Sequence, residues 1–525
     1  MILKEEIAKP LASIREKVMI NEALISSLIL ILALAMGAFL RIWQINAMGF
    51  NTDEAVYSGQ AAALAGVPIL KDIFPVFRAH PLLFQVLLSL VYRIQFSDLA
   101  GRVLAVIIGM GTVFLTYQTG KTLYGRLTGA FAAFFMALMP YHVVVSRQVL
   151  LDGPMVFFTT LALYFLALFG TSQKPVWLYL TGAGMGLAVL SKETSIILMG
   201  AIYAFLALAS DLRLKVKDVI LSLAVFALVI LPFPLSILLA GVSHIGSNYL
   251  SWQLFRRPNH EWSFYLTTVP QMLGYLVIAA AIAGIILLWR SRSWREKLLL
   301  VWVGVTYLFF QLWPVKGFQY LLPLAPAAAI LAARFFGKLL SDDSMHLLPA
   351  RIAKFRFMNL AVWFLAAAAV FSLGWSSWQR IQPNISSRFL AGTGGVPGGR
   401  EAGAWIRENV PQNATFMTIG PSMANIVAFY GQRTAYGLSV SPNPLHRNPS
   451  YTPINNPDAQ IRRSELQYLV WDSFSAARSS FFSEKVLSYV SKYNGRIVHE
   501  ETITVIDEQG RQVVKPIIII YEVHP

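Results

Sequence analysis

The sequence predicts a mainly α-helical, polytopic membrane bundle followed by a small α/β domain, and three observations support this fold class. Of the 525 residues, 56% are hydrophobic and only 13% are charged, a composition that soluble globular domains do not reach. Apolar runs of about 20 residues, the length of a bilayer-spanning helix, recur through the first 378 positions. After residue 378 the runs stop, and strand-like patterns with turn residues begin.

The apolar runs predict about eleven transmembrane helices. Two runs, 176–190 and 194–210, are short and could together form one broken span. The full set comprises residues 24–43, 99–118, 126–145, 153–170, 176–190, 194–210, 218–240, 268–289, 298–314, 318–337 and 357–376.

The segment 81–96 is amphipathic rather than uniformly apolar. Leucine and valine residues recur at helical spacing between positions 82 and 91, while Gln85, Arg93 and Gln95 are polar. Such a helix either lies flat in the membrane interface or crosses as an additional span. We favour the interfacial interpretation, because an additional span would reverse every later loop.

The net charge of +16 follows from membrane topology and does not indicate a nucleic-acid partner. If segment 81–96 does not cross the membrane, all the basic clusters fall on one side of it. An excess of Lys and Arg is typical of cytoplasmic loops. We therefore predict an integral protein of the plasma or inner membrane with a cytoplasmic N-terminus and an extracytoplasmic C-terminal domain. The clusters lie near residues 4–17, 121–126, 213–217, 290–297 and 351–356.

The composition divides the chain into a membrane domain over 1–380, a flexible Gly-rich linker over 381–399 and an extracytoplasmic domain over 400–525. The stretch 439–458, rich in Pro and Asn, predicts a long loop that is either ordered or faces a substrate. Patterning and turn residues in the last domain predict helices over 402–409, 422–430 and 480–493 and strands over 415–419, 468–471, 496–506 and 515–523.

Acids and cations gather in the loops that this topology places outside. A bundle with both kinds of group on one face suits an anionic, lipid-linked substrate. A base would then lie among the acids, and a phosphate among the Arg, Lys and His side chains. The candidate catalytic residues are Asp53, Glu54 and Asp152, and the candidate substrate-binding residues are His80, Arg147, Lys192, Lys316 and Tyr320.

The order of these motifs resembles a known family. The first 340 residues resemble the type C glycosyltransferases, especially the group of protein O-mannosyltransferases and lipid A aminoarabinose transferases. The C-terminal domain resembles that of some prokaryotic, particularly archaeal, members. The matching motifs are Asp53-Glu54 after the first span, His80-Pro81-Leu82, the loop from Arg147 to Asp152-Gly153-Pro154, the stretch 186–192 and Tyr320-Leu321-Leu322-Pro323.

The resemblance implies an enzyme that takes a sugar from a dolichyl or undecaprenyl phosphate and transfers it on the extracytoplasmic face. Its partners would be that donor, a protein, lipid or glycan acceptor, and membrane lipids. A polyprenyl phosphate is already a good leaving group, so the protein needs a base for the acceptor hydroxyl and cations for the developing phosphate charge.

Each candidate residue then has an expected role. Asp53 suits the base, whereas Glu54 points in another direction and is expected to orient the loop or pair with a cation. Asp152 resembles the second acid of the family and would hold acceptor or sugar hydroxyls. Lys316 and Tyr320 lie one turn apart at a helix start, where a phosphate binds readily.

Plainer interpretations of the same residues stay open. The pair Asp53-Glu54 could cap a helix at the water interface, and Asp152 could be an N-cap before Gly-Pro. His80 could be a turn residue beside its proline, and Lys192 could extend to the membrane interface. Arg147 could instead hold a lipid headgroup.

No cofactor is expected, and a dedicated metal site is unsupported, because the sequence has no Asp-x-Asp pair and no ligand cluster at metal spacing. One divalent cation held by Asp53, Glu54 and Asp152, as in the related oligosaccharyltransferases, is the weaker alternative. The main rival function is a polytopic transporter or flippase for a lipid-linked or anionic substrate. The chain lacks the matched halves typical of transporters. A glycan polymerase or ligase and a non-catalytic scaffold are further rivals.

Overall fold

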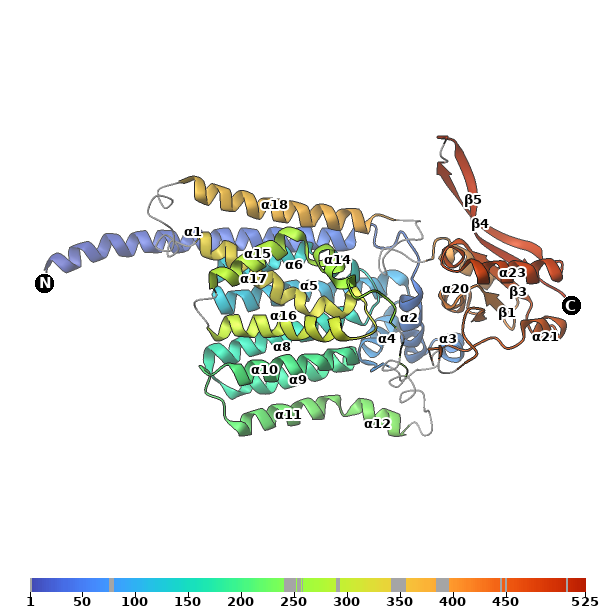
Figure 1. Ribbon diagram of the computed structural model, residues 1–525, viewed down its shortest axis with the longest axis horizontal. Helices are drawn as coiled ribbons and strands as arrows, with labels where there is room; N and C mark the ends of the chain where they lie inside the picture. Colours follow the sequence, from blue (N-terminus) through green and yellow to red (C-terminus); the bar gives the residue numbers. More distant parts are fainter. Residues whose placement is uncertain are drawn as a thin grey trace.

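A long helical bundle carries a small sheet domain at one end in the computed structural model of the chain (Figure 1). The structure describes residues 2–74, 80–239, 252, 256, 258–288, 293–340, 356–383, 396–443, 446–448, 451–506 and 509–525.

The long helices of the bundle run roughly parallel to one another (Figure 1). The helix α1 packs on α6, α5 packs on α6 and α8, and α9 packs on α8 and α11. The bundle consists of α1 (Ile2–Ile42), α2 (Thr52–Ala65), α3 (Pro68–Ile73), α4 (Leu83–Ile94), α5 (Asp98–Tyr124), α6 (Arg126–Leu138), α7 (Pro140–Val145), α8 (Asp152–Ser172), α9 (Pro175–Ser191), η1 (Glu193–Ile196), α10 (Ile197–Leu208), α11 (Val216–Ile230), α12 (Pro232–Leu239), α14 (Phe264–Leu273), α15 (Tyr275–Leu288), α16 (Trp294–Leu312), η2 (Phe318–Leu324), α17 (Ala325–Leu340) and α18 (Arg356–Ile381).

Several helices meet the length and composition of a membrane span, so the predicted fold class is confirmed. Within the described residues, five helices are long and apolar enough to cross a bilayer, or seven if each of two bent pairs is one span. The number of about eleven spans stays a prediction. The five are Glu22–Ile42, Asp98–Tyr124, Asp152–Ser172, Phe318–Leu340 and Leu360–Ile381, and the bent pairs are Val216–Ile230 with Pro232–Leu238 and Phe264–Leu273 with Tyr275–Ile286.

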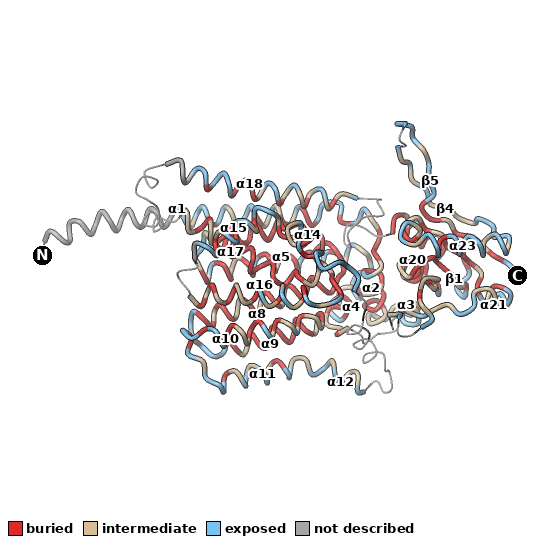
Figure 2. Tube along the Cα trace, viewed as in Figure 1, coloured by how far each residue is buried: buried red, intermediate tan, exposed pale blue. Residues whose placement is uncertain are grey.

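Burial follows the position of each helix in the bundle (Figure 2). The central helices α6 and α17 are buried along most of their length. The outer helix α11 instead exposes large apolar side chains such as Ile220 and Leu228. Exposed apolar surface of this extent is typical of a lipid-facing helix.

The predicted amphipathic segment 81–96 forms α4, which packs on α2 and α5. Figure 1 shows α2, α3 and α4 at the end of the bundle that faces the sheet domain. One face of α4 buries Phe84 and Leu88 against α2, while Leu90 and Ile94 are exposed on the other face. This two-faced burial fits the interfacial helix that the sequence predicts.

The C-terminal domain is a five-stranded sheet with the strand order β2-β1-β3-β5-β4. The pairs β1–β2 and β1–β3 are parallel, and the pairs β3–β5 and β4–β5 are antiparallel. Its elements are α19 (Gly399–Asn409), β1 (Thr415–Thr418), α20 (Pro421–Ile426), a π-helical turn η4 (Val427–Gly431), β2 (Thr434–Gly437), α21 (Pro457–Arg462), β3 (Tyr468–Asp472), α22 (Ser473–Ala476), α23 (Ser480–Lys492), β4 (Arg496–Ile506) and β5 (Gln512–Glu522).

Each strand and helix predicted for this domain is present within a few residues of its expected bounds. The sequence analysis missed the strand β2 and the short helices α21 and α22. Four to six residues, such as Thr-Ala-Tyr-Gly of β2, are too few to show a periodic pattern. The division of the chain into three domains stays a prediction, and residues 384–395 of the expected linker lie outside the described residues.

Hydrogen bonds fix the sheet domain to the bundle at the start of α5. The guanidinium of Arg400 lies 2.9 Å from the carboxylate of Asp98, which also accepts a hydrogen bond from the Tyr430 hydroxyl. The backbone N–H of Phe50 donates to the same hydroxyl at 2.7 Å. Asn425 donates to the Thr52 hydroxyl at the first turn of α2. The domain is thus held directly against the loop that carries the first acidic pair.

Candidate functional site

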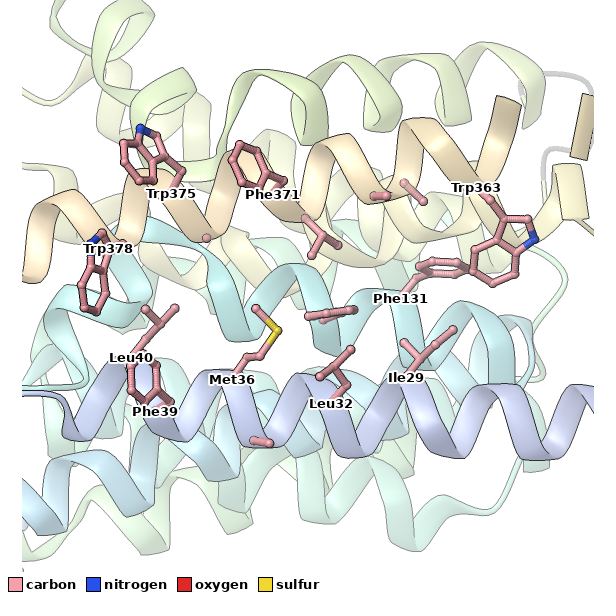
Figure 3. Close-up of a pocket in the computed structure, with 16 residues that line it drawn as sticks. Ile29, Leu32, Met36, Phe39, Leu40, Phe131, Trp363, Phe371, Trp375 and Trp378 are labelled. Carbon is pink, nitrogen blue, oxygen red and sulfur yellow. The ribbon is translucent and has the colours of Figure 1, made fainter. Parts of the chain in front are cut away.

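An apolar groove of about 1010 Å³ lies between α1, α6 and α18. Figure 3 shows Phe39 of α1 and Trp378 of α18 facing each other, with their ring centroids 6.0 Å apart. Its lining contains no acid, base or nucleophile. Such a groove suits lipid chains and offers no group for a reaction, so we exclude it as the reaction site.

A second cavity, of about 470 Å³, lies between the bundle and the C-terminal domain and is rich in polar groups. Its volume falls within the range of ligand sites. Helices of the bundle supply Asp53, Val56, Tyr57, Gln60, His80, Lys192, Glu193, Thr194, Trp252, Arg256, Gln319 and Tyr320, and the C-terminal domain supplies Pro421, Ser439, Val440, Ser441, His446, Arg447, Asn448 and Tyr451. We call this hollow the polar cavity.

The start of α2 separates the two adjacent acids of the first motif. Asn51 is the N-cap, and its side-chain oxygen accepts hydrogen bonds from the N–H groups of Asp53 and Glu54. The Glu54 carboxylate accepts a hydrogen bond from the Asn51 N–H, which completes a capping box. Because neighbouring residues of a helix point in different directions, Glu54 turns inward and Asp53 faces the polar cavity.

Glu54 pairs with a cation, as the sequence analysis expected. Its two carboxylate oxygens accept bonds of 2.9 Å from the Arg102 guanidinium, and both side chains are almost fully buried. Arg102 also donates to the backbone carbonyls of Ile45, Met48 and Gly49. This bidentate pair holds the loop before α2 in place, so Glu54 serves to position Asp53.

Asp53 and Glu193 are the acids that line the polar cavity, and Glu193 is paired with His80. Burial by the surrounding protein raises the pKa of the Asp53 carboxyl, Lys192 and His80 lower it, and Asp152 raises it. The net direction is upward. A carboxylate with a raised pKa is a stronger base, which is the property that general-base catalysis requires.

Lys192 and Asp152 form a buried ion pair beside Asp53. The Lys192 Nζ lies 2.8 Å from Asp152 Oδ1 and 5.5 Å from the centre of the Tyr320 ring. Asp152 is the first residue of α8, and it makes no side-chain cap bond there. Since Lys192 lines the cavity and Asp152 does not, the acid acts on the site through the lysine.

His80 and Glu193 form another pair on the cavity wall. The His80 Nδ1 lies 2.9 Å from Glu193 Oε2, and the ring of His80 stands edge-on to that of Tyr57 at 6.3 Å. Glu193 begins the turn η1, directly after the break in the helix at Lys192. The stretch 186–192 of the sequence analysis ends one residue before Glu193, and a lone acid after a lysine gave no signal that it would face His80.

Arg256 is a strong phosphate candidate on the cavity wall. It lies over the Trp252 ring at 4.6 Å, and its charge acts on both Tyr320 and Tyr451. No carboxylate of the described residues pairs with it. The sequence analysis did not include Arg256 among its candidate residues, because its loop shows no pattern that would place it beside Asp53.

Two predicted binding residues lie outside the lining of the polar cavity. The Lys316 ammonium donates to the carbonyls of Gln311 and Trp313 at the end of α16, and the Arg147 guanidinium donates to the carbonyls of Leu40 and Arg41 at the end of α1. Cations satisfy helix C-termini in this way. The phosphate site expected from Lys316 with Tyr320 stays a prediction, and of the two residues only Tyr320 lines the polar cavity.

The C-terminal domain contributes residues that no motif identified as functional. Tyr451 lies beside Asp53, and burial together with the charge of Asp53 raises the pKa of its hydroxyl. Arg447 and His446 line the same wall. They come from the stretch 439–458, which the sequence predicted to be ordered or to face a substrate.

No group of three His, Asp or Glu side chains that could hold a metal ion occurs in the described part of the chain. The three acids that could have shared one cation point apart, since Glu54 faces Arg102 and Asp152 faces Lys192. Only Asp53 remains directed into the cavity.

Comparisons with known proteins agree with this architecture. The sequence profile of the dolichyl-phosphate-mannose-protein mannosyltransferase family matches residues 79–237. A Bacillus subtilis protein, YkcB, which is provisionally described as a mannosyltransferase, is 32% identical over 133 residues. That match covers 24% of this chain and 18% of the relative.

Solved structures share the fold at low sequence identity. ArnT from Cupriavidus metallidurans superimposes with a TM-score of 0.69 at 13% identity, over 94% of this chain and 97% of its own. The Archaeoglobus fulgidus oligosaccharyltransferase superimposes with a TM-score of 0.61 at 15% identity, over 93% of this chain and 74% of its own. The chain is therefore an integral membrane protein with the type C glycosyltransferase fold, and its residues 79–237 match the dolichyl-phosphate-mannose-protein mannosyltransferase family.

Proposed function

We propose that the protein transfers a sugar from a polyprenyl phosphate to a hydroxyl group of an acceptor, on the extracytoplasmic side of the membrane. The observation that carries the proposal is that Asp53 shares one cavity with Arg256 and Lys192. An acid with a raised pKa and cations beside it are the two requirements of this reaction.

In the proposed reaction, the Asp53 carboxylate takes the proton of the acceptor hydroxyl. The acceptor oxygen forms a bond to the anomeric carbon of the sugar as the bond from that carbon to the phosphate oxygen breaks. The electron pair of the broken bond stays on the phosphate. Arg256, and Lys192 held by Asp152, stabilise the charge that grows on the phosphate, which lowers the transition-state energy more than that of the bound donor.

Two structural relatives support the class of donor. ArnT was solved bound to undecaprenyl phosphate, and the Archaeoglobus fulgidus oligosaccharyltransferase AglB was solved with an inhibitory peptide and a dolichol-phosphate. These ligands belong to those proteins, and we extend only their shared chemistry, a polyprenyl chain with an anionic head, to this chain.

The test is incubation of the purified protein in lipid nanodiscs with radiolabelled polyprenyl phosphate sugars and native membranes. We expect release of polyprenyl phosphate together with label on one class of acceptor. Asp53→Asn, prepared in the same way, should release almost none. Absence of release from every donor in the set, with intact protein, would reject sugar transfer and favour the transport alternative.

A further inference from the structure

A third hollow, of about 360 Å³, lies beside the polar cavity. The two share five lining residues, which are Val56, Gln60, Pro421, Val440 and Tyr451. On one side lie α2 and α3 of the bundle, and on the other lie α20 and β2 of the C-terminal domain. We call this hollow the edge groove.

The edge groove runs along the edge of β2. All four residues of β2, from Thr434 to Gly437, line it. Successive side chains of a strand point to opposite faces of the sheet. A hollow that touches every residue of the strand must therefore border the edge rather than one face. The strand order confirms that β2 is the outermost strand on this side of the sheet.

The hydrogen-bond pattern leaves the outer backbone of β2 available. The N–H of Leu438 donates to Thr418 of β1, so by the alternation of a strand Tyr436 also faces β1 and Ala435 faces outward. Within the described residues, no loop or helix backbone donates to Ala435 or accepts from it. An edge of this kind is a template for pairing with another extended chain.

The geometry of α2 links this edge to the proposed base. Asp53, Val56 and Gln60 lie on one face of the helix at spacings of three and four residues. At 1.5 Å per residue, Gln60 is about 10 Å along the helix from Asp53, which is the length of about three residues of extended chain. A chain paired with β2 would therefore reach Asp53 with a residue only a few positions away.

We infer that the acceptor is a polypeptide segment, which binds in the edge groove as an added strand on β2 and presents a hydroxyl side chain to Asp53. This inference rests on the proposed function, and it assigns to the C-terminal domain the role of the acceptor site. Tyr451 and Gln60, which line both hollows, would guide the side chain from one to the other.

The test measures peptide binding, which does not depend on the donor. A fluorescent heptapeptide of alternating valine and threonine is titrated against the full-length protein in nanodiscs and followed by anisotropy. Ala435→Pro removes the outward N–H, and we expect it to weaken binding about three- to tenfold, the effect of losing a hydrogen bond. Ile506→Pro, on the opposite edge strand β4, is the control and should bind as the unchanged protein does.

Two modified peptides keep the test decisive even if Ala435→Pro does not fold. One carries N-methyl groups on the valines and the other on the threonines. Only alternate residues of an added strand face β2, so we expect one modified peptide to lose binding and the other to keep it. Equal loss in both, or unchanged binding in both, would overturn the strand-pairing inference.

Parallel measurement of polyprenyl phosphate release separates this inference from the proposed function. If no peptide binds, but the protein releases polyprenyl phosphate in the presence of native lipids, the acceptor is a lipid or glycan. That result would reject the edge groove as a peptide site and leave sugar transfer standing. If peptides bind in one register only and no donor is turned over, the inference about the groove survives and the transfer function fails.

Discussion

The ammonium of Lys192 lies 2.8 Å from the carboxylate of Asp152, with both side chains largely buried and the lysine facing the polar cavity. Breaking a buried ion pair leaves one charge without its partner and costs about 3–5 kcal/mol. We therefore expect Lys192→Met and Asp152→Leu each to lower the midpoint of thermal unfolding and to reduce transfer strongly without abolishing it.

The double variant distinguishes a structural pair from a functional one. Replacing both partners by apolar residues is often neutral for stability, so Lys192→Met with Asp152→Leu should recover the unfolding midpoint. Transfer should stay low, because the cation that faces the donor is gone. Recovery of both properties would show that the pair serves the fold alone.

Asp53→Asn should reduce transfer about 10²- to 10⁴-fold, the usual loss when a positioned base is removed. Donor binding and the fold should be kept, since Asn preserves the volume and Asn51 still caps α2. The exposed acid Asp211, far along the chain, provides the matched control Asp211→Asn, which should transfer normally. Near-native turnover by Asp53→Asn would move the search for the base to Asp152 and Glu54.

The acid limb of the pH–rate profile should report the raised pKa of Asp53. The base must be ionised, so kcat/KM should rise with pH through a midpoint above the ordinary carboxyl value of 3.8. Lys192 lowers the pKa of Asp53. In Lys192→Met, the residual kcat/KM should therefore rise with pH through a midpoint that is higher still. A limb at or below the ordinary value would contradict the assignment.

The raised pKa of Asp53 also determines in which direction this carboxyl changes the stability of the protein with pH. A carboxyl whose pKa is raised on folding stabilises the folded state below its unfolded pKa, and this contribution is lost as pH rises through the folded pKa. Asp53→Asn should therefore gain stability relative to the unchanged protein as the pH is raised, in thermal unfolding scans. A constant difference across the pH range would show that the carboxyl is not perturbed.

Donor affinity should depend on Arg256 and much less on Lys316. A hydrogen bond to a charged group is worth about 1.5–3 kcal/mol, so Arg256→Ala should weaken polyprenyl phosphate binding by roughly tenfold or more. Lys316→Ala should instead lower stability, since the carbonyls of Gln311 and Trp313 lose their donor. A larger loss of affinity for Lys316→Ala in donor titrations would restore the phosphate site that the sequence alone predicted.

The orientation in the membrane is tested by reporters fused after Pro525. The basic clusters predict an extracytoplasmic C-terminal domain, so an alkaline phosphatase fusion should be active and a cytoplasm-only reporter inactive. The opposite result would reverse the topology and place the polar cavity on the cytoplasmic side.

The sequence by itself determined the class of the protein and the existence of its acidic pair. Apolar spans and four of the five strands of the last domain follow from composition and periodicity, which are local properties of the chain. The orientation in the membrane stays a prediction. The positions of Asp53, His80, Lys192 and Tyr320 in one cavity agree with the grouping made from the order of their motifs.

The tertiary structure alone determined which charged side chains form ion pairs that hold the fold together and which line the polar cavity. Glu54 is held by Arg102, 48 residues later, while Arg256 and Tyr451 line the cavity of Asp53 from segments to which the sequence assigned no chemical role. Sequence spacing says which residues share a helix face. It does not say which distant side chain meets them, because that depends on how whole helices and the C-terminal domain pack. The partners of each cation, and therefore its role, follow from the tertiary fold and not from the local sequence.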